Sequence, residues 1–159
     1  MDLDSDQSET YIRRTIQMAR DAAERGDRPC GSLLVQDGIV LSEDTNRVYT
    51  ENDLALHPEL SLARWADQNL SEDQRTETTL YTTVEPCSMC ATAIGMTGLG
   101  TVVYCVDGDS YWEFAANAGH SVPEDYIPCK EVIDRMGCKT KVLGPLLESD
   151  GMNMVRDVM

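Results

Sequence analysis

The chain has 159 residues, of which 42% are hydrophobic and 26% charged, a composition typical of a folded globular protein and not of a disordered one. This length suits one core, so we expect residues 1–159 to form a single domain. No apolar run approaches the roughly 18 residues of a membrane helix. The acidic, polar residues 1–9 do not resemble a signal peptide. We therefore expect a cytoplasmic protein with no membrane partner.

The balance of charge bears on the partners of the chain. There are 13 Lys and Arg residues against 28 Asp and Glu residues, a formal net charge of −15. A field of this sign repels phosphate backbones, and no basic stripe offsets it, so nucleic acid is an unfavourable partner. Acidic surfaces are also typical of halophilic proteins. In molar salt the Debye length is only about 3 Å, and the charge then says little about the substrate.

The first expected element is a helix that residues 6–9 can cap and that Gly26 ends, with one apolar face (Ile12, Ile16, Ala19 and Ala23). Residues 31–36 and 39–42 are short β-type runs joined by an Asp-Gly turn, which predicts a hairpin. The polar, irregular residues 43–56 that follow are expected to form a loop.

Helices and strands then alternate. The expected helices cover residues 58–69, 86–94, 110–118 and 131–136, with a last one from Pro145, and the expected strands cover residues 78–84, 101–106 and 139–143. A hairpin followed by this alternation predicts an α/β fold, with one sheet of about five strands between helices.

Three residues have side chains that bind zinc: His57, Cys87 and Cys90. His57 begins one expected helix, and the two cysteines, three positions apart, share a face in the first turn of another. Helix N-termini carry positive partial charge, which favours the thiolate that zinc requires. One imidazole and two thiolates leave the fourth position of a zinc tetrahedron open, which distinguishes catalytic from structural sites. We therefore expect these residues to hold a catalytic Zn²⁺.

Glu59 completes the constellation. It lies two residues after His57, where its carboxylate can approach a zinc-activated water without binding the metal. A carboxylate in that place can take a proton from the water and return it to a leaving group, so Glu59 is the expected catalytic residue. His57-x-Glu59 followed by Pro86-Cys87-x-x-Cys90 is the signature of zinc-dependent nucleobase deaminases.

Other interpretations of these residues remain open. A redox Cys-x-x-Cys pair needs neither His57 nor Glu59, and two buried thiols need no partner. A structural zinc site needs a fourth ligand, and the only other histidine, His120, lies in a glycine-flanked loop that we expect at the surface. Nothing indicates export, so the remaining cysteines are expected to be unpaired, buried small side chains (Cys30, Cys105, Cys129 and Cys138).

The chain resembles the cytidine deaminase superfamily, and within it the branch of cytosine, guanine and transfer-RNA adenosine deaminases. The resemblance runs from the first helix to about Asp107, roughly two thirds of the chain. Many relatives have Ala where this chain has Pro58, which the first turn of a helix tolerates. The resemblance is carried by the hairpin 33–41, Asn46-Arg47-Val48, His57-Pro58-Glu59, the run Leu-Tyr-Thr-Thr-Val-Glu-Pro-Cys-Ser-Met-Cys at residues 80–90, and Val103-Tyr104.

This resemblance implies a three-layer α/β/α sandwich with a mixed sheet of about five strands. It implies a hydrolytic reaction in which a zinc-activated water displaces an exocyclic amine as ammonia while Glu59 moves the protons. It also implies that Asn46 hydrogen-bonds the ring of the base, with a plain turn role as the alternative, and that the backbone around Ala55 and Glu85 helps hold the substrate. Family members usually form homodimers, so we expect one here.

The sequence leaves the substrate open. We expect a small nucleobase or nucleoside of the cytosine or guanine type, because a chain of charge −15 without a basic patch suits a tRNA loop poorly. One alternative is a tRNA or RNA adenosine deaminase. Another is a catalytically inactive zinc-binding interaction module, against which the intact Glu59 argues.

Two further groups of residues bear on these alternatives. A cluster of arginines beside the zinc would favour an RNA substrate, but we expect these residues mainly on an exposed helix face (Arg13, Arg14, Arg20 and Arg25). Trp112 and Phe114 are expected to fill the core beneath a loop, with stacking on a bound base as the alternative.

Overall fold

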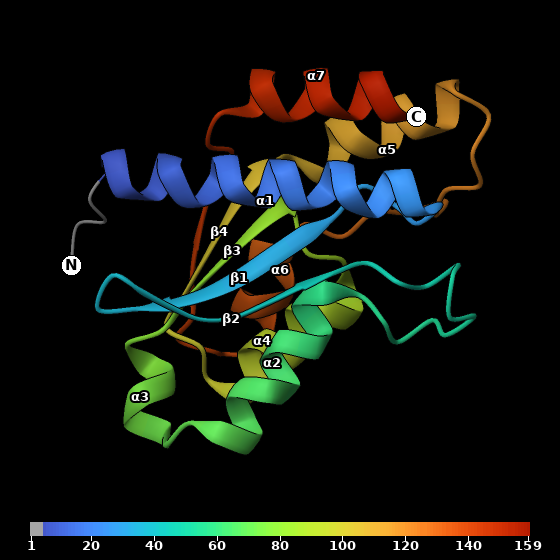
Figure 1. Ribbon diagram of the computed structural model, residues 1–159. Helices are drawn as coiled ribbons and strands as arrows, with labels where there is room; N and C mark the ends of the chain where they lie inside the picture. The colour runs from blue at the N-terminus through green and yellow to red at the C-terminus, as the bar shows by residue number, and fades with distance from the viewer. Residues whose placement is uncertain (1–4) are drawn as a thin grey trace.

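The structure is a computed structural model that describes residues 5–159. Its centre is a five-stranded sheet in the order β2-β1-β3-β4-β5 (Figure 1). The strands are β1 (Gly31–Gln36), β2 (Ile39–Thr45), β3 (Thr79–Val84), β4 (Thr101–Val106) and β5 (Lys141–Leu143). Strand β1 is antiparallel to β2 and β3, whereas β3, β4 and β5 are parallel. The mixed sheet predicted from the sequence is confirmed.

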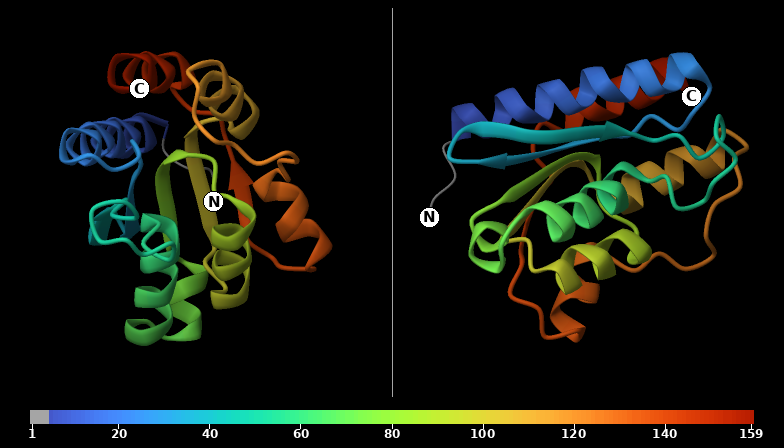
Figure 2. Two further views of the ribbon diagram at one scale, coloured as in Figure 1. Left: turned by 90° about the vertical axis from the view of Figure 1, so that its right-hand side faces the viewer. Right: turned by 60° about the horizontal axis from the view of Figure 1, so that its bottom comes forward.

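Helices cover both faces of the sheet, and the three layers are visible in both views of Figure 2. One face carries α1 (Ser5–Arg25), α5 (Gly108–Asn117) and α7 (Glu148–Val158). The other face carries α2 (Pro58–Asn69), α4 (Ser88–Thr97) and α6 (Cys129–Arg135), with the short α3 (Glu72–Thr76) between α2 and β3. This arrangement is the predicted α/β/α sandwich.

The two cores follow from the alternation of side chains along each strand. Leu33, Tyr81 and Val103 are in register across β1, β3 and β4, and they pack beneath α1 and α7. The residues next to them pack beneath α2 and α4 instead (Leu34, Leu80 and Val102). Because both faces are apolar, these strands read as continuous hydrophobic runs in the sequence.

Several boundaries differ from those predicted. Helix α4 begins at Ser88, with Cys87 as its N-cap, and not at Pro86. Helix α7 begins at Glu148 and not at Pro145, because its N-cap, Leu147, has a left-handed backbone conformation with φ 59°. Helix α3 was not predicted; Ser71 and Gln74 form its capping box.

Residues 1–9 were expected not to be a signal peptide. The first four of them lie outside the described residues. Within residues 5–159, none of the helices combines the length and the apolar character needed to cross a membrane.

Candidate metal centre and active site

The candidate site lies at the edge of the sheet where β3 ends. Because β1 runs antiparallel to both neighbours, the start of β1 and the end of β2 lie at this same edge. Helices α2 and α4 pack side by side and begin here. His57 is the N-cap of α2, Cys87 is the N-cap of α4, and Cys90 lies in the first turn of α4. The topology thus joins residues about 30 positions apart in the chain.

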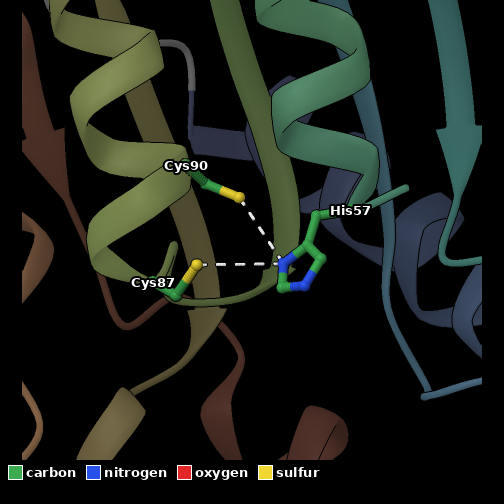
Figure 3. Close-up of side chains that lie close together, drawn as sticks. All are labelled: His57, Cys87 and Cys90. Atoms are coloured by element: carbon green, nitrogen blue, oxygen red, sulfur yellow. Dashed lines mark hydrogen bonds between the residues drawn. The ribbon is translucent and has the colours of Figure 1, made fainter. Parts of the chain in front are cut away.

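The three side chains converge on one point (Figure 3). The Nδ1 atom of His57 lies 3.8 Å from the Cys87 sulfur and 3.6 Å from the Cys90 sulfur. All three ligand atoms lie within 4.8 Å of one another. In tetrahedral zinc sites with ordinary bond lengths, nitrogen and sulfur ligands are about 3.6 Å apart. The donor set and its spacing therefore fit zinc.

The protonation of the two thiols also suits a metal. A hydrogen bond from Cys90, aided by His57, lowers the pKa of the Cys87 thiol to about 4. The hydrogen bond to Cys87 and burial both raise the pKa of Cys90. The lowered pKa favours the thiolate form of Cys87, which is the form that binds metal, and a cation at this point would favour loss of the Cys90 proton as well.

Glu59 lies beside this group but is not one of its three members. Its side chain is only 4% exposed, and burial raises the pKa of its carboxyl group above the ordinary value. One oxygen, Oε1, accepts hydrogen bonds from Cys30 and Thr82, and the other, Oε2, lies 3.8 Å from the Cys90 sulfur. This position suits a group that moves protons near the metal without binding it.

A cavity of about 40 Å³ opens onto these residues. Asn46, which follows β2 directly, is 3% exposed and lines this cavity, and its Oδ1 accepts a hydrogen bond from the Val48 amide. Glu85 also lines it. Ala55 is exposed, does not line the cavity, and donates its amide hydrogen to Asp53. The substrate contacts expected for Asn46, Ala55 and Glu85 remain predictions.

Four residues at the cavity had no assigned site role in the sequence: Arg28, Cys30, Val84 and Tyr111. Arg28 and Cys30 flank Pro29 in the loop before β1, and no motif spacing singles them out. Cys30 was expected only to fill space, yet its sulfur hydrogen-bonds Glu59 at 3.3 Å.

Two aromatic rings pack against Arg28, which lines the cavity. Its guanidinium carbon lies 5.4 Å from the centre of the Trp112 ring and 5.7 Å from that of Tyr49. A second cavity of about 300 Å³ shares Arg28, Tyr111 and Trp112 with the first. Trp112 therefore both packs against the core and borders the site, whereas Phe114 lies outside both cavities.

Residues that were candidates for an RNA surface lie elsewhere. Arg13 pairs with Asp150, and Arg20 pairs with Asp157, both on α7. None of the four arginines of α1 lines the site cavity (Arg13, Arg14, Arg20 and Arg25). His120 is exposed, as expected, and borders the second cavity.

Comparisons with known proteins agree with this site. Residues 5–106 match the family model of the cytidine and deoxycytidylate deaminase zinc-binding region. A tRNA-specific adenosine deaminase of Agrobacterium fabrum is 38% identical over 94 residues, which cover 59% of this chain and 62% of the relative. A guanine deaminase of Bacillus subtilis is 37% identical over 87 residues, which cover 54% of this chain and 56% of the relative. The match spans less than two thirds of each.

A solved structure from work on A-to-I editing by tRNA:A34 deaminases shares 27% identity, with a TM-score of 0.70 over 92% of this chain and 99% of that one. The family model covers most of the chain and includes all three candidate zinc ligands and Glu59. The chain therefore belongs to the zinc-binding cytidine and deoxycytidylate deaminase family, within the cytidine deaminase superfamily.

Proposed function

We propose that this protein hydrolytically deaminates the exocyclic amine of a small nucleobase or nucleoside of the cytosine or guanine type. The observation that carries this proposal is the convergence of His57, Cys87 and Cys90 beside the buried carboxylate of Glu59. Zinc supplies a Lewis acid that makes a water molecule acidic near neutral pH. No fourth protein ligand joins the three among the described residues, which matches a catalytic site.

The chain's own residues have distinct tasks in this reaction. His57, Cys87 and Cys90 would hold the zinc ion, and two of them, His57 and Cys87, line the cavity. Glu59 takes a proton from the attacking water at Oε2, delivers it to the ring nitrogen, and carries the second proton to the departing ammonia. Burial raises the pKa of Glu59, which makes this carboxylate a better proton acceptor than an exposed one.

The volumes of the cavities support a small substrate. The inner cavity of about 40 Å³ adjoins the cavity of about 300 Å³, and together they match the lower end of small-molecule sites, about 300–1,000 Å³. Asn46 at the inner wall offers an amide that can hydrogen-bond the ring of a base. The net charge of −15 and the paired arginines of α1 favour a small substrate over an RNA strand.

A second candidate function is deamination of adenosine in tRNA or RNA. It is favoured by the relatives, because both the Agrobacterium protein and the solved structure carry that description. The inactive interaction module is a weaker candidate, since Glu59 is in place. For either activity we propose a homodimer, as the family resemblance implies; the molecular mass in solution tests this.

The test of the proposed function is ammonia release by zinc-loaded protein in high salt. The panel contains cytosine, guanine, adenine, their nucleosides and an RNA hairpin. Turnover of a cytosine- or guanine-type compound supports the proposal. Turnover of the hairpin alone assigns the second function, and absence of turnover on the whole panel contradicts both.

A further inference from the structure

The carboxylate of Glu59 is held by polar side chains that the metal chemistry does not require. The Cys30 thiol lies 3.3 Å from Oε1, and the Thr82 hydroxyl donates a hydrogen bond of 3.1 Å to the same oxygen. The Ser32 hydroxyl in turn donates a hydrogen bond of 2.8 Å to the Thr82 oxygen. Ser32 and Thr82 are fully buried and Cys30 is 8% exposed, so this network is shielded from water.

The two oxygens of Glu59 differ in their surroundings. Both donors, Cys30 and Thr82, act on Oε1. Among the described side chains, the hydrogen-bond contact of Oε2 is with the Cys90 sulfur, at 3.8 Å. Oε2 is thus the oxygen left to exchange protons with water and substrate.

Cys30 is suited to act as a donor. Burial, and then the neighbouring charge of Glu59, raise the pKa of the Cys30 thiol well above its ordinary value, so the thiol keeps its proton. Thr82 is itself oriented, since its oxygen accepts from Ser32 and its hydrogen is directed to Glu59. The donors lie on β1 and β3 or directly beside them, in the buried centre of the sheet.

We propose that Cys30, together with Thr82, is a positioning residue for Glu59, fixing Oε1 so that Oε2 faces the metal ligands. This inference rests on the proposed function, in which Glu59 moves the protons. A carboxylate free to rotate would spend less time in the productive orientation, and rate depends steeply on such geometry. Loss of the thiol therefore slows the chemical step and leaves substrate binding unchanged.

Steady-state kinetics of three variants test this inference. Cys30→Ala removes the donor and lowers kcat about tenfold, which is the size expected for one hydrogen bond of ordinary strength. Its KM and zinc content stay at the wild-type values. Cys30→Ser keeps a donor of similar size and restores most of the lost kcat. The matched control is Cys105→Ala, because that buried thiol also donates a 3.3 Å bond, to the Leu147 carbonyl, away from the site.

The outcomes separate this inference from the proposed function. Unchanged kcat in Cys30→Ala, or a raised KM with unchanged kcat, overturns the positioning role. A second readout does not need activity: the infrared S–H stretching band of Cys30, isolated by subtracting the Cys30→Ser spectrum. We expect this band to shift to higher frequency in Glu59→Ala, which removes the acceptor. An unshifted band overturns the inference even if the protein deaminates nothing on the panel.

Discussion

The carboxylate of Glu85 accepts a hydrogen bond of 2.7 Å from the backbone amide of Cys129, 44 residues further along the chain. Its other oxygen accepts a hydrogen bond of 3.0 Å from the amide of Gly108. Glu85 lies two residues before Cys87, so this one buried side chain ties the metal-binding loop to the starts of α5 and α6. The segment after β4 thus supports the site directly.

We predict that Glu85→Gln destabilises the fold by about 1–3 kcal/mol, because one buried amide loses its acceptor and the charge assistance to the other is lost. The free energy of unfolding in urea measures the effect. Glu113→Gln, on the exposed side of α5, is the control and changes stability by less than about 0.5 kcal/mol. Equal stabilities of the two variants would show that the Glu85 link contributes nothing.

The two histidines of the chain form a matched pair for testing the metal site. We expect His57→Ala to bind zinc far more weakly, since only two cysteine ligands remain. His120→Ala keeps full zinc content because His120 is exposed and lies outside the ligand group. The measurement is the amount of zinc per chain in each variant after dialysis, determined by atomic absorption. Retention of zinc by His57→Ala would disprove this ligand assignment.

The environment of Asp27 predicts that the stability of the fold depends on pH. Burial acts to raise its pKa, but hydrogen bonds from Thr50 and Tyr49, with the charge of Arg25, lower it overall from the ordinary value of 3.8. A pKa that is lower in the folded state stabilises the fold above 3.8, and this contribution is lost as the pH falls through the folded-state pKa. At neutral pH we expect the melting temperature of wild type to be higher than that of Asp27→Asn. In acid we expect the difference between the two melting temperatures to disappear. A gap that is constant with pH would contradict this assignment.

The excess of acidic residues predicts a response to salt. At a net charge of −15, self-repulsion destabilises the compact state, and ions screen that repulsion. We therefore expect the melting temperature to rise as KCl increases to molar concentrations. Sucrose at equal osmolality serves as a control for general exclusion effects. A melting temperature that does not respond to KCl removes the halophilic interpretation and makes the charge informative about partners again.

The sequence was most informative where a short spacing has one chemical meaning. His57-x-Glu59 and Pro86-Cys87-x-x-Cys90 each place their side chains by local helix geometry, so the ligand group could be predicted. The central strands β1, β3 and β4 were also predictable, because both of their faces are apolar and the runs are continuous. These features depend on neighbours within a few residues.

Features that depend on distant contacts could not be predicted in this way. Cys30 meets Glu59 only because α2 packs against β1, which no local pattern reveals. Likewise, nothing near Glu85 in the sequence indicates that its carboxylate binds the amides of Gly108 and Cys129. The start of α7 depends on the backbone conformation of Leu147, a residue type that rarely adopts it.

The role of Glu59 is tested most directly by comparing wild type with Glu59→Gln. Zinc per chain and ammonia release are measured on the same samples. Because the proposed role of Glu59 is to move protons and not to bind the metal, we expect equal zinc content. We also expect a loss of activity of about 10²–10⁴-fold, the usual contribution of a general acid–base group. Loss of zinc from Glu59→Gln, or full activity with zinc bound, would contradict the central claim.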